Sequence, residues 1–567
     1  MGLGPDPAVR RRVDAAGWAA GTRADPRGME IARSRRRRWG EGARPPASLQ
    51  GPTPMVQASK QFLSGRRLVV VSNRLPVVLN RRSEREWSLE RGAGGLVTAL
   101  EPVLSRVGGV WVGWPGVSSD EAPDIEGVLA GESPRLGYRL EGVPLSARER
   151  DDFYLGFSNQ VVWPLFHDFQ GKCNFLPRFW DAYVTVNRKF AHVASRVVRR
   201  GDFLWVQDYH LMGMGESLRE RGLDLDTGFF LHTPFPALDI FRKLPWRLSI
   251  LRSLLHYDLL GLQTPRDREN FLHTLRCLAP SVRLTQQGRL VTAWIGSHAV
   301  KVGVFPISID AEEFERTARA ARTMRRVAEL RATLGEGGLD DEDGERTVMI
   351  LGVDRLDYTK GIPHKLRGYR AALRKYPDLR GRVTLLQLVI PSREDIPEYN
   401  EMKDEIERLV GEISGEFQHV GWSPIYYRYG TWDREELVAH YRAARIALVT
   451  PLKDGMNLVA KEYCVSSGEA GGVLILSEHA GAAAQLQEDA VMVNPYDEDG
   501  IARAIQRAFM MKPKERGERM ARLRARIRAE DIHWWARTFL QAAGSREPAE
   551  SDRDRRSPLP EGFMSGA

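Results

Sequence analysis

The stretch IALVTPLKDGMNLVAKEYC, residues 446–464, places a short apolar run directly before a turn and a run of helix formers. Its first five residues are apolar or β-branched, which is typical of a strand buried on both faces. Asp454 and Gly455 occupy the turn, and good helix formers follow them. A strand that passes directly into a helix is the repeating unit of a parallel sheet, so this stretch predicts an α/β fold.

Short apolar runs of the same kind recur along the chain and alternate with helical patterns. They lie at 67–72, 109–114, 203–208 and 228–233 in the first half, and at 347–353, 384–390, 446–450 and 472–477 in the second. Residues 401–417 carry apolar and charged residues at helical spacing, which indicates one of the intervening helices. We therefore predict two Rossmann-like, doubly wound parallel-sheet domains that face a central cleft.

Changes of composition set the predicted domain limits. Residues 1–65 form an Arg-rich extension and residues 545–567 a polar tail, and both have the composition of disordered segments. Residues 310–345 begin as a helical pattern and become a Gly/Asp/Glu-rich loop, where we place the junction. The predicted domains span residues 66–330 and 345–528, and residues 529–544 form a C-terminal helix that packs back on the first domain.

The bulk composition is that of a soluble globular protein. The 567 residues are 42% hydrophobic and 28% charged, and no run of 18 or more apolar residues occurs. The three widely spaced cysteines argue against a disulfide framework or a Cys-based metal site, and they favour a reducing cytoplasm. Residues 1–65 contain 12 Arg or Lys and 5 Asp or Glu, so most of the formal charge of +9 belongs to the extension. The arginine run 35–38 suits an anionic partner or a plain disordered extension, and we favour the extension.

Polar side chains follow six of the predicted strands. The segments are SNR (72–74), DYH (208–210), HTPFP (232–236), DRLDYTKG (354–361), PSRED (391–395) and KDG (453–455). Ligands of doubly wound sheets bind outside the carboxyl ends of the strands. The sequence therefore predicts that these segments line a binding cleft.

Two of the motifs allow both a chemical and a structural interpretation. Arg355 and Lys360 could hold a diphosphate without a metal, or one of them could pair with Asp357 in a solvated turn. The glycine-rich segment ERGAGGLVTAL (90–100) could bring a diphosphate or a sugar to a helix start, or could simply begin a helix. It is not a dinucleotide fingerprint, because Val97 stands where the last glycine is required.

The turn at Asp454 has the same two interpretations. Asp454 and Glu462 are eight residues apart, so on a continuous helix they would share one face. The N–H groups that follow Gly455 would be unpaired at the helix start. This arrangement suits the hydroxyl groups of a hexose and of a nucleotide ribose. The alternative is an Asp N-cap above a buried Leu-Val stripe.

Taken together and in order, these motifs resemble the trehalose-6-phosphate synthase family from about Arg67 to Leu540. The matching segments are VVVSNRLPV, GGLVTAL, FSNQVVWPLFHD, WVQDYHL, GFFLHTPFP, GVDRLDYTKG, PLKDGMNLVAKEY and NPYD. The resemblance implies the GT-B architecture and a retaining transfer of glucose from a nucleotide diphosphate glucose, commonly UDP-glucose. The acceptor would be glucose 6-phosphate and the product α,α-trehalose 6-phosphate, with no metal and no cofactor.

The resemblance also assigns site residues. The acceptor site it implies consists of Arg74, Tyr154, Trp163, Asp208 and Arg393. The donor site it implies consists of Gly95, His232, Arg355, Lys360, Asp454, Gly455, Met456, Asn457, Leu458, Val459 and Glu462, which binds the ribose. The residues that carry the chemistry would be His232, Arg355, Lys360 and Asp454. The chain departs from the family at Lys453, often Arg, and at His479, often Phe.

Other functions fit parts of the sequence. A sister transferase could use another phosphorylated acceptor, such as glycerol 3-phosphate or a cyclitol phosphate. A non-catalytic sugar-phosphate sensor would have lost Arg355, Lys360 or Asp454, and a nicotinamide dehydrogenase would need the missing fingerprint. The expected partners are the nucleotide sugar and glucose 6-phosphate in the cytoplasm. Neither nucleic acid nor membrane is expected for the folded body, and a homo-oligomer is left open.

Overall fold

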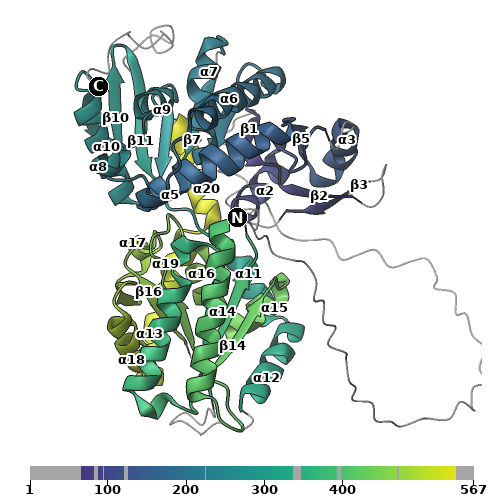
Figure 1. Cartoon of the computed structure of the whole chain (residues 1–567). Helices are drawn as coiled ribbons and strands as arrows, with labels where there is room; N and C mark the ends of the chain where they lie inside the picture. The colour runs from purple at the N-terminus through teal and green to yellow at the C-terminus, as the bar shows by residue number, and fades with distance from the viewer. Residues whose placement is uncertain are drawn as a thin grey trace, which may run out of the picture. The chain divides into compact units, whose positions relative to one another are not determined.

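The computed structural model describes residues 66–81, 87–92, 95–120, 125–223, 225–335, 347–392, 397–468 and 471–544. The predictions made for residues 1–65 and 545–567 therefore lie outside the described residues. The described part of the chain contains two large sheets and the helices that cover them (Figure 1).

The larger sheet contains nine strands among the described residues, in the order β5-β4-β1-β6-β7-β8-β11-β10-β9. All neighbouring strands are parallel except around β10, which is antiparallel to β11 and to β9. The strands are β1 (Leu68–Arg74), β4 (Gly109–Trp114), β5 (Arg139–Gly142), β6 (Phe203–Gln207), β7 (Asp226–Phe230), β8 (Leu259–Leu262), β9 (Arg283–Gln287), β10 (Leu290–Ile295) and β11 (His298–Val304). A separate hairpin pairs β2 (Val77–Arg81) with β3 (Trp87–Arg91).

Helices connect these strands and bury both faces of the sheet. They are α2 (Gly95–Val107), α3 (Ile125–Leu136), α4 (Ala147–Glu149), the π-helical segment η1 (Arg150–Val162), α5 (Trp163–Phe166), α6 (Pro177–Val197), α7 (Met214–Glu220), α8 (Leu238–Phe241), α9 (Arg247–Leu254) and α10 (Pro265–Leu278). Every residue of β6 is buried, as expected for a short apolar strand covered on both sides.

The second sheet is parallel throughout its six described strands, in the order β14-β13-β12-β15-β16-β17. The strands are β12 (Val348–Arg355), β13 (Val383–Ile390), β14 (Ile425–Tyr429), β15 (Ile446–Val449), β16 (Val473–Ser477) and β17 (Val491–Val493). The helices are α11 (Ala311–Arg319), α12 (Ala321–Gly335), α13 (Ile362–Lys375), α14 (Pro397–Phe417), α15 (Arg434–Ala443), α16 (Leu458–Ser466), α17 (Ala483–Leu486), α18 (Glu498–Met510) and α19 (Pro513–Ala529). A predominantly parallel sheet and a fully parallel one, each covered by helices, confirm the predicted fold class.

The chain has left the first sheet by Ile309, at the start of the segment 310–345 in which we placed the junction and before the predicted limit of the first domain at residue 330. Ile309 and Phe314 already pack in the same buried cluster as Met349 and Leu351 of β12. Both α11 and α12 therefore belong to the cover of the second sheet. The apolar side chains of these helices pack on that sheet. The polar loop that follows them differs in composition but is not the point where the chain leaves the first sheet.

The last described helix, α20 (Ile532–Gly544), packs on the first sheet, although α19 before it packs on the second. Figure 1 draws α20 in yellow near β7. Trp535 and Phe539 are fully buried and stack on Trp205 of β6, with ring centroids 4.9 and 4.4 Å apart. The chain therefore passes between the two sheets twice.

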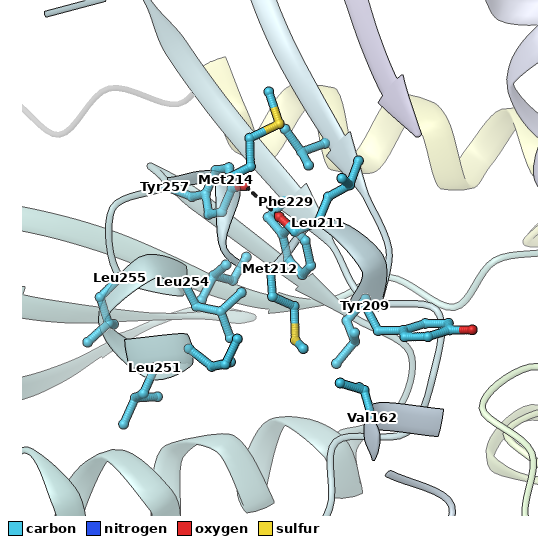
Figure 2. Packing of buried hydrophobic residues seen from close by; sticks show 14 of the residues in the cluster. Val162, Tyr209, Leu211, Met212, Met214, Phe229, Leu251, Leu254, Leu255 and Tyr257 are labelled. Carbon is cyan, nitrogen blue, oxygen red and sulfur yellow. Dashed lines mark hydrogen bonds between the residues drawn. The ribbon is translucent and has the colours of Figure 1, made fainter. Parts of the chain in front are cut away.

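A rigid hydrophobic core lies beneath the turn that follows β6. Tyr209 and Leu211 are buried there together with Phe229 and the apolar residues of α9 (Figure 2). The Tyr183 hydroxyl donates to the Tyr209 carbonyl over 2.9 Å, and the Tyr257 hydroxyl donates to the Leu211 carbonyl over 3.3 Å. These contacts hold the backbone beside Asp208 in place.

Candidate active site

The predicted site residues lie at the carboxyl ends of adjacent strands. Arg74 ends β1, Asp208 follows β6 and His232 lies two residues after β7, and these three strands are neighbours in the first sheet. Arg355 ends β12 and Asp454 lies in the loop after β15, which pairs with β12 in the second sheet. The topology thus collects residues that are far apart in the sequence.

Aromatic rings surround the guanidinium group of Arg74. Its Cζ atom lies 4.4 Å from the ring centroid of Trp114 and 5.5 Å from that of Tyr154. Tyr154 in turn stacks on His210, with ring centroids 5.9 Å apart. The rings orient the arginine fork by cation–π contact while the residue itself remains exposed. The sequence reasoning missed Trp114, and it placed His210 in a cleft-lining segment without giving it a role.

Trp163 lies close to Arg355 at the end of β12. Its side chain is buried, and the guanidinium group of Arg355 lies 5.9 Å from its ring centroid. On the other side, the His167 ring lies 4.1 Å away and donates from Nδ1 to the Trp163 carbonyl over 2.7 Å. Burial lowers the pKa of His167 to about 4, so this ring is neutral near pH 7.

Asp208 has a strained backbone conformation at the end of β6. Its φ of 71° lies in the left-handed region, which a non-glycine residue adopts only where surrounding contacts enforce it. The carboxylate accepts the backbone N–H of His232 over 3.1 Å. Burial raises the pKa of Asp208 to about 6, and the backbone N–H donors and the charge of Arg355 oppose that rise.

His232 is buried, and both ring nitrogens face glutamine side chains. Nε2 lies 2.9 Å from Oε1 of Gln207, and Nδ1 lies 3.5 Å from Nε2 of Gln263. Burial lowers the pKa of His232 to about 3, so the imidazole is neutral near pH 7. Both ring nitrogens of His232, which the resemblance places in the donor site, thus have protein partners that the sequence reasoning missed.

Lys360 and Asp454 form an ion pair between the ends of β12 and β15. The Lys360 Nζ lies 2.6 Å from Oδ2 of Asp454, and Asn457 Nδ2 donates to the same oxygen over 3.1 Å. Burial would raise the pKa of Asp454, but the Lys360 ammonium outweighs it and holds the pKa below its usual value. Asp357 accepts the Thr359 N–H over 3.0 Å. Lys360 is thus paired with Asp454 across 94 residues of sequence.

The loop around Asp454 differs from the predicted helix start. Helix α16 begins only at Leu458, so Asp454 and Glu462 do not share a helical face. Asn457, with φ of 65°, is the N-cap, and its side chain accepts the Ala460 N–H over 3.1 Å. The Met456 N–H is not unpaired either, because it donates to Oδ1 of Asp454 over 3.2 Å. A parallel bridge to Ala480 fixes Asp454 outside the helix.

Gly455 lies directly against the turn that carries His232. A Cβ atom at this position would lie 2.3 Å from the His232 carbonyl oxygen and 3.0 Å from the Pro234 nitrogen. Since the obstacles are backbone atoms, they cannot move aside cheaply. The glycine is therefore required for the close approach of the two loops.

Glu462 lies on α16 and is hydrogen-bonded to a buried tyrosine. The Tyr441 hydroxyl donates to Oε2 of Glu462 over 2.8 Å. Burial raises the pKa of Glu462, which the Tyr441 hydrogen bond and the charge of Arg434 oppose. The tyrosine orients the carboxyl group, leaving its other oxygen for a further donor.

Of the remaining predicted residues, the structure describes Gly95, Leu458 and Val459. Gly95 is the first residue of α2, whereas Gly94 before it lies outside the described residues. Leu458 and Val459 are the first two residues of α16 and are half-buried. Arg393 also lies outside the described residues, so its predicted acceptor contact remains a prediction.

Contacts near the site join the two sheets. Lys453 Nζ lies 2.8 Å from Oδ2 of Asp168. Asp168 lies in the turn after α5 and has a φ of 67°. Beside this pair the Phe169 ring meets the Tyr358 ring edge-on, with centroids 5.0 Å apart. The sequence noted Lys453 only as a departure and did not identify its partner.

The described residues contain neither a candidate metal centre nor a candidate membrane helix. No group of three or more His, Cys, Asp or Glu side chains there could hold a metal ion. Likewise, none of the described helices combines the length and the apolar character that crossing a membrane requires.

Comparison with known proteins places this site in a family. A family model described as glycosyltransferase family 20 matches residues 66–545. The chain belongs to glycosyltransferase family 20. The match covers both sheets and every predicted site residue, and it confirms the resemblance drawn from the motifs.

Members of glycosyltransferase family 20 resemble the chain over nearly their whole length. The trehalose-6-phosphate synthase of Mycolicibacterium vanbaalenii is 42% identical over 495 residues, which is 86% of this chain and 97% of that protein. The trehalose-6-phosphate synthase of Mycobacterium tuberculosis is 42% identical over 487 residues, 85% of this chain and 95% of that protein.

Solved structures of the family share the fold. One is the UDP-forming α,α-trehalose-phosphate synthase of Burkholderia xenovorans in complex with glucose-6-phosphate, with a TM-score of 0.74 at 31% identity over 84% of this chain and 100% of that one. Another, from E. coli, is bound with UDP-2-fluoro glucose and has a TM-score of 0.74 at 35% identity over 85% of this chain and 100% of that one. The two-sheet architecture is the GT-B fold that the family predicts.

Proposed function

We infer that this glycosyltransferase transfers glucose from UDP-glucose to glucose 6-phosphate with retention and forms α,α-trehalose 6-phosphate. The observation that carries the inference is the ion pair of Lys360 with Asp454, beside Arg355, at the carboxyl ends of paired strands. It brings cations suited to a diphosphate next to a carboxylate suited to sugar hydroxyls. Relatives that cover the same residues are trehalose-6-phosphate synthases.

We assign the leaving diphosphate to Arg355 and Lys360. An ammonium group has three N–H donors, so Lys360 can keep Asp454 and still donate to phosphate oxygens. Arg355 supplies a planar fork and a permanent charge. Both charges oppose the negative charge that develops on the diphosphate as the glycosidic bond breaks, which lowers the barrier to the oxocarbenium-like transition state.

We assign the donor sugar to the loop from Asp454 to Val459 and the ribose to Glu462. Asp454 is held ionised by Lys360 and can accept hydrogen bonds from glucose hydroxyl groups. The Glu462 carboxyl group, oriented by Tyr441, accepts from the ribose hydroxyls. In the front-face mechanism the leaving phosphate oxygen takes the proton of the attacking hydroxyl, so these residues position and stabilise charge rather than attack the anomeric carbon.

We assign the acceptor to Arg74, Tyr154, Trp163 and Asp208, with Arg393 assigned from the sequence alone. Arg74 and Arg393 would bind the 6-phosphate, and the rings around Arg74 hold its fork in place. Asp208 is suited to a hydroxyl group of the acceptor because its carboxylate already lies beside His232. We place the reaction in the cytoplasm, where nucleotide sugars and hexose phosphates are supplied.

A release assay with purified protein tests this function. UDP-, GDP- and ADP-glucose are each offered with glucose 6-phosphate, glycerol 3-phosphate or plain glucose, and the product is identified by NMR of its anomeric protons. We expect UDP release that depends on glucose 6-phosphate and a product with two α-linked anomeric carbons. Preference for glycerol 3-phosphate would favour a sister transferase, and failure with every pair would favour a non-catalytic sensor.

A further inference from the structure

The side chains around His232 form a string of buried polar groups. Gln207 ends β6, Gln263 directly follows β8, and both side chains are almost completely buried. They contact opposite nitrogens of the same imidazole ring. None of the motif assignments above gives either glutamine a role.

The orientation of Gln263 is set by a backbone donor. The N–H of Ile307 points at Oε1 of Gln263 over 2.9 Å. A backbone N–H can only donate, so this atom of the amide must be the oxygen. The other end of the amide is then the NH2 group, and it faces Nδ1 of His232.

The tautomer of His232 follows from that orientation. Nδ1 faces an N–H donor, so it must act as the acceptor and carry no proton, and a neutral ring then carries its proton on Nε2. This proton meets Oε1 of Gln207 at 2.9 Å. With that orientation the Gln207 NH2 group has no hydrogen-bond partner among the described residues. The reverse orientation would place two donors opposite each other.

The string continues into the second sheet. The carbonyl of Ile307 accepts from Nζ of Lys461 on α16 over 2.7 Å, so Ile307 is held at both its N–H and its C=O. Lys461 is buried and also donates to Oε1 of Gln485 over 2.6 Å. Gln485 in turn donates to Glu530, just before α20. The chain crosses from one sheet to the other near Ile307 and near Glu530, and both crossings therefore take part in this series of hydrogen bonds.

We propose that Gln263 is a positioning residue for the transfer reaction: it holds His232 as the Nε2–H tautomer and ties the ring to the passage between the two sheets. The proposal rests on the proposed function, together with the donor-site role that the family resemblance implies for His232. The backbone from His232 to Pro234 lies against Gly455. A ring held as one tautomer therefore keeps this backbone in place beside the donor loop.

Two isosteric substitutions test the proposal. In Gln263→Glu the carboxylate still accepts the Ile307 N–H but cannot donate to Nδ1, so the proton must move to Nδ1 or a second proton must bind. In Gln207→Glu the carboxylate still accepts from Nε2–H, so the tautomer is kept. Both variants introduce a carboxylate of the same size next to the same ring, which makes each the control of the other.

Two measurements are compared on the full chain. Long-range ¹H–¹⁵N correlation spectra of histidine-labelled protein report the ring state, with the His232 signal assigned by its loss in His232→Gln. UDP release at saturating substrates reports turnover. We expect an Nε2–H pattern in the wild type and in Gln207→Glu and a different pattern in Gln263→Glu. A misplacement of about 1 Å in a reaction site can cost about 10²-fold, so Gln263→Glu should lose at least about ten-fold more turnover than Gln207→Glu.

Three results would overturn the proposal. They are an Nδ1–H pattern in the wild type, an unchanged ring in Gln263→Glu, or equal turnover of the two variants despite a changed ring. Should Gln263→Glu fail to fold, Gln263→Met keeps the volume, removes the donor to Nδ1 and should yield a mixture of tautomers; a single Nε2–H tautomer in this variant would equally refute the proposal. The spectra do not depend on activity, so a failure of the proposed function would leave the ring measurement intact and be recognised separately.

Discussion

Replacement of Lys360 by methionine isolates the charge at the centre of the proposed donor site. The substitution keeps most of the side-chain volume and removes only the ammonium group, which lies 2.6 Å from Oδ2 of Asp454. Loss of one preorganised donor at a site of developing charge costs about 2.7–4 kcal/mol, so turnover should fall by about 10²–10³-fold. The measurement is UDP release at saturating UDP-glucose and glucose 6-phosphate.

The same substitution should cost less stability than activity. Removing one partner of a buried ion pair typically destabilises by about 3–5 kcal/mol because a charge is left uncompensated. At this site Asn457 and the Met456 N–H continue to donate to Asp454, so we expect a loss below that range. Urea unfolding of wild type and variant gives the difference in the free energy of unfolding.

Lys365→Met is the matched control. Lys365 is fully buried on α13 and pairs with Asp354, which also accepts from Nε2 of Gln387 over 2.9 Å. None of these residues belongs to the proposed donor site. We expect this variant to lose more stability than Lys360→Met while its folded fraction turns over like the wild type. Near-normal turnover of folded Lys360→Met, or equal turnover losses in the two variants, would refute the donor-site assignment.

Three further predictions test other parts of the structure. Gly455→Ala should lower both turnover and the free energy of unfolding, because the new Cβ would lie 2.3 Å from the His232 carbonyl oxygen and backbone atoms cannot move aside cheaply; wild-type stability with full activity would show that the loops separate freely. Asp208→Asn should raise the melting temperature at neutral pH, and this gain should shrink as the pH falls from about 6 towards the usual carboxyl pKa of 3.8. The reason is that the folded pKa of Asp208, about 6, lies above its usual value, so ionisation costs stability as the pH rises through that value; a gain independent of pH would refute it. Trp535→Ala should cost about 3–5 kcal/mol in the free energy of unfolding, because a fully buried ring that stacks on Trp205 is removed; a change below about 1 kcal/mol would mean that α20 contributes little to the first sheet.

The sequence by itself determined the strands whose apolar character is local. The run at 347–353 begins one residue before β12, the run at 384–390 lies in β13, and the helical pattern at 401–417 lies in α14. Such runs are predictable because a strand covered on both faces needs apolar side chains at every position. The order of the motifs was enough to identify the family, since each motif is a contiguous segment.

Only the tertiary structure decided which polar groups meet. Asp454 was expected on the helix with Glu462, but a bridge to Ala480 holds it in the preceding loop, where it pairs with Lys360. The spacing of residues within one motif could not show these contacts, because Ala480 and Lys360 lie 26 and 94 residues away from Asp454 in the sequence. Hydrogen-bond partners are selected by the register of strands and by the packing of whole helices.

The same reason applies to His232 and to the passage between the sheets. The motif around His232 shows only a histidine after a strand. The tautomer of this histidine depends on Gln207, Gln263 and the backbone of Ile307. The helices of 311–335 look alike in composition whichever sheet they cover, and buried contacts with β12 assign them to the second. A local pattern determines that a segment will be buried, whereas the surface that buries it is chosen by the rest of the folded chain.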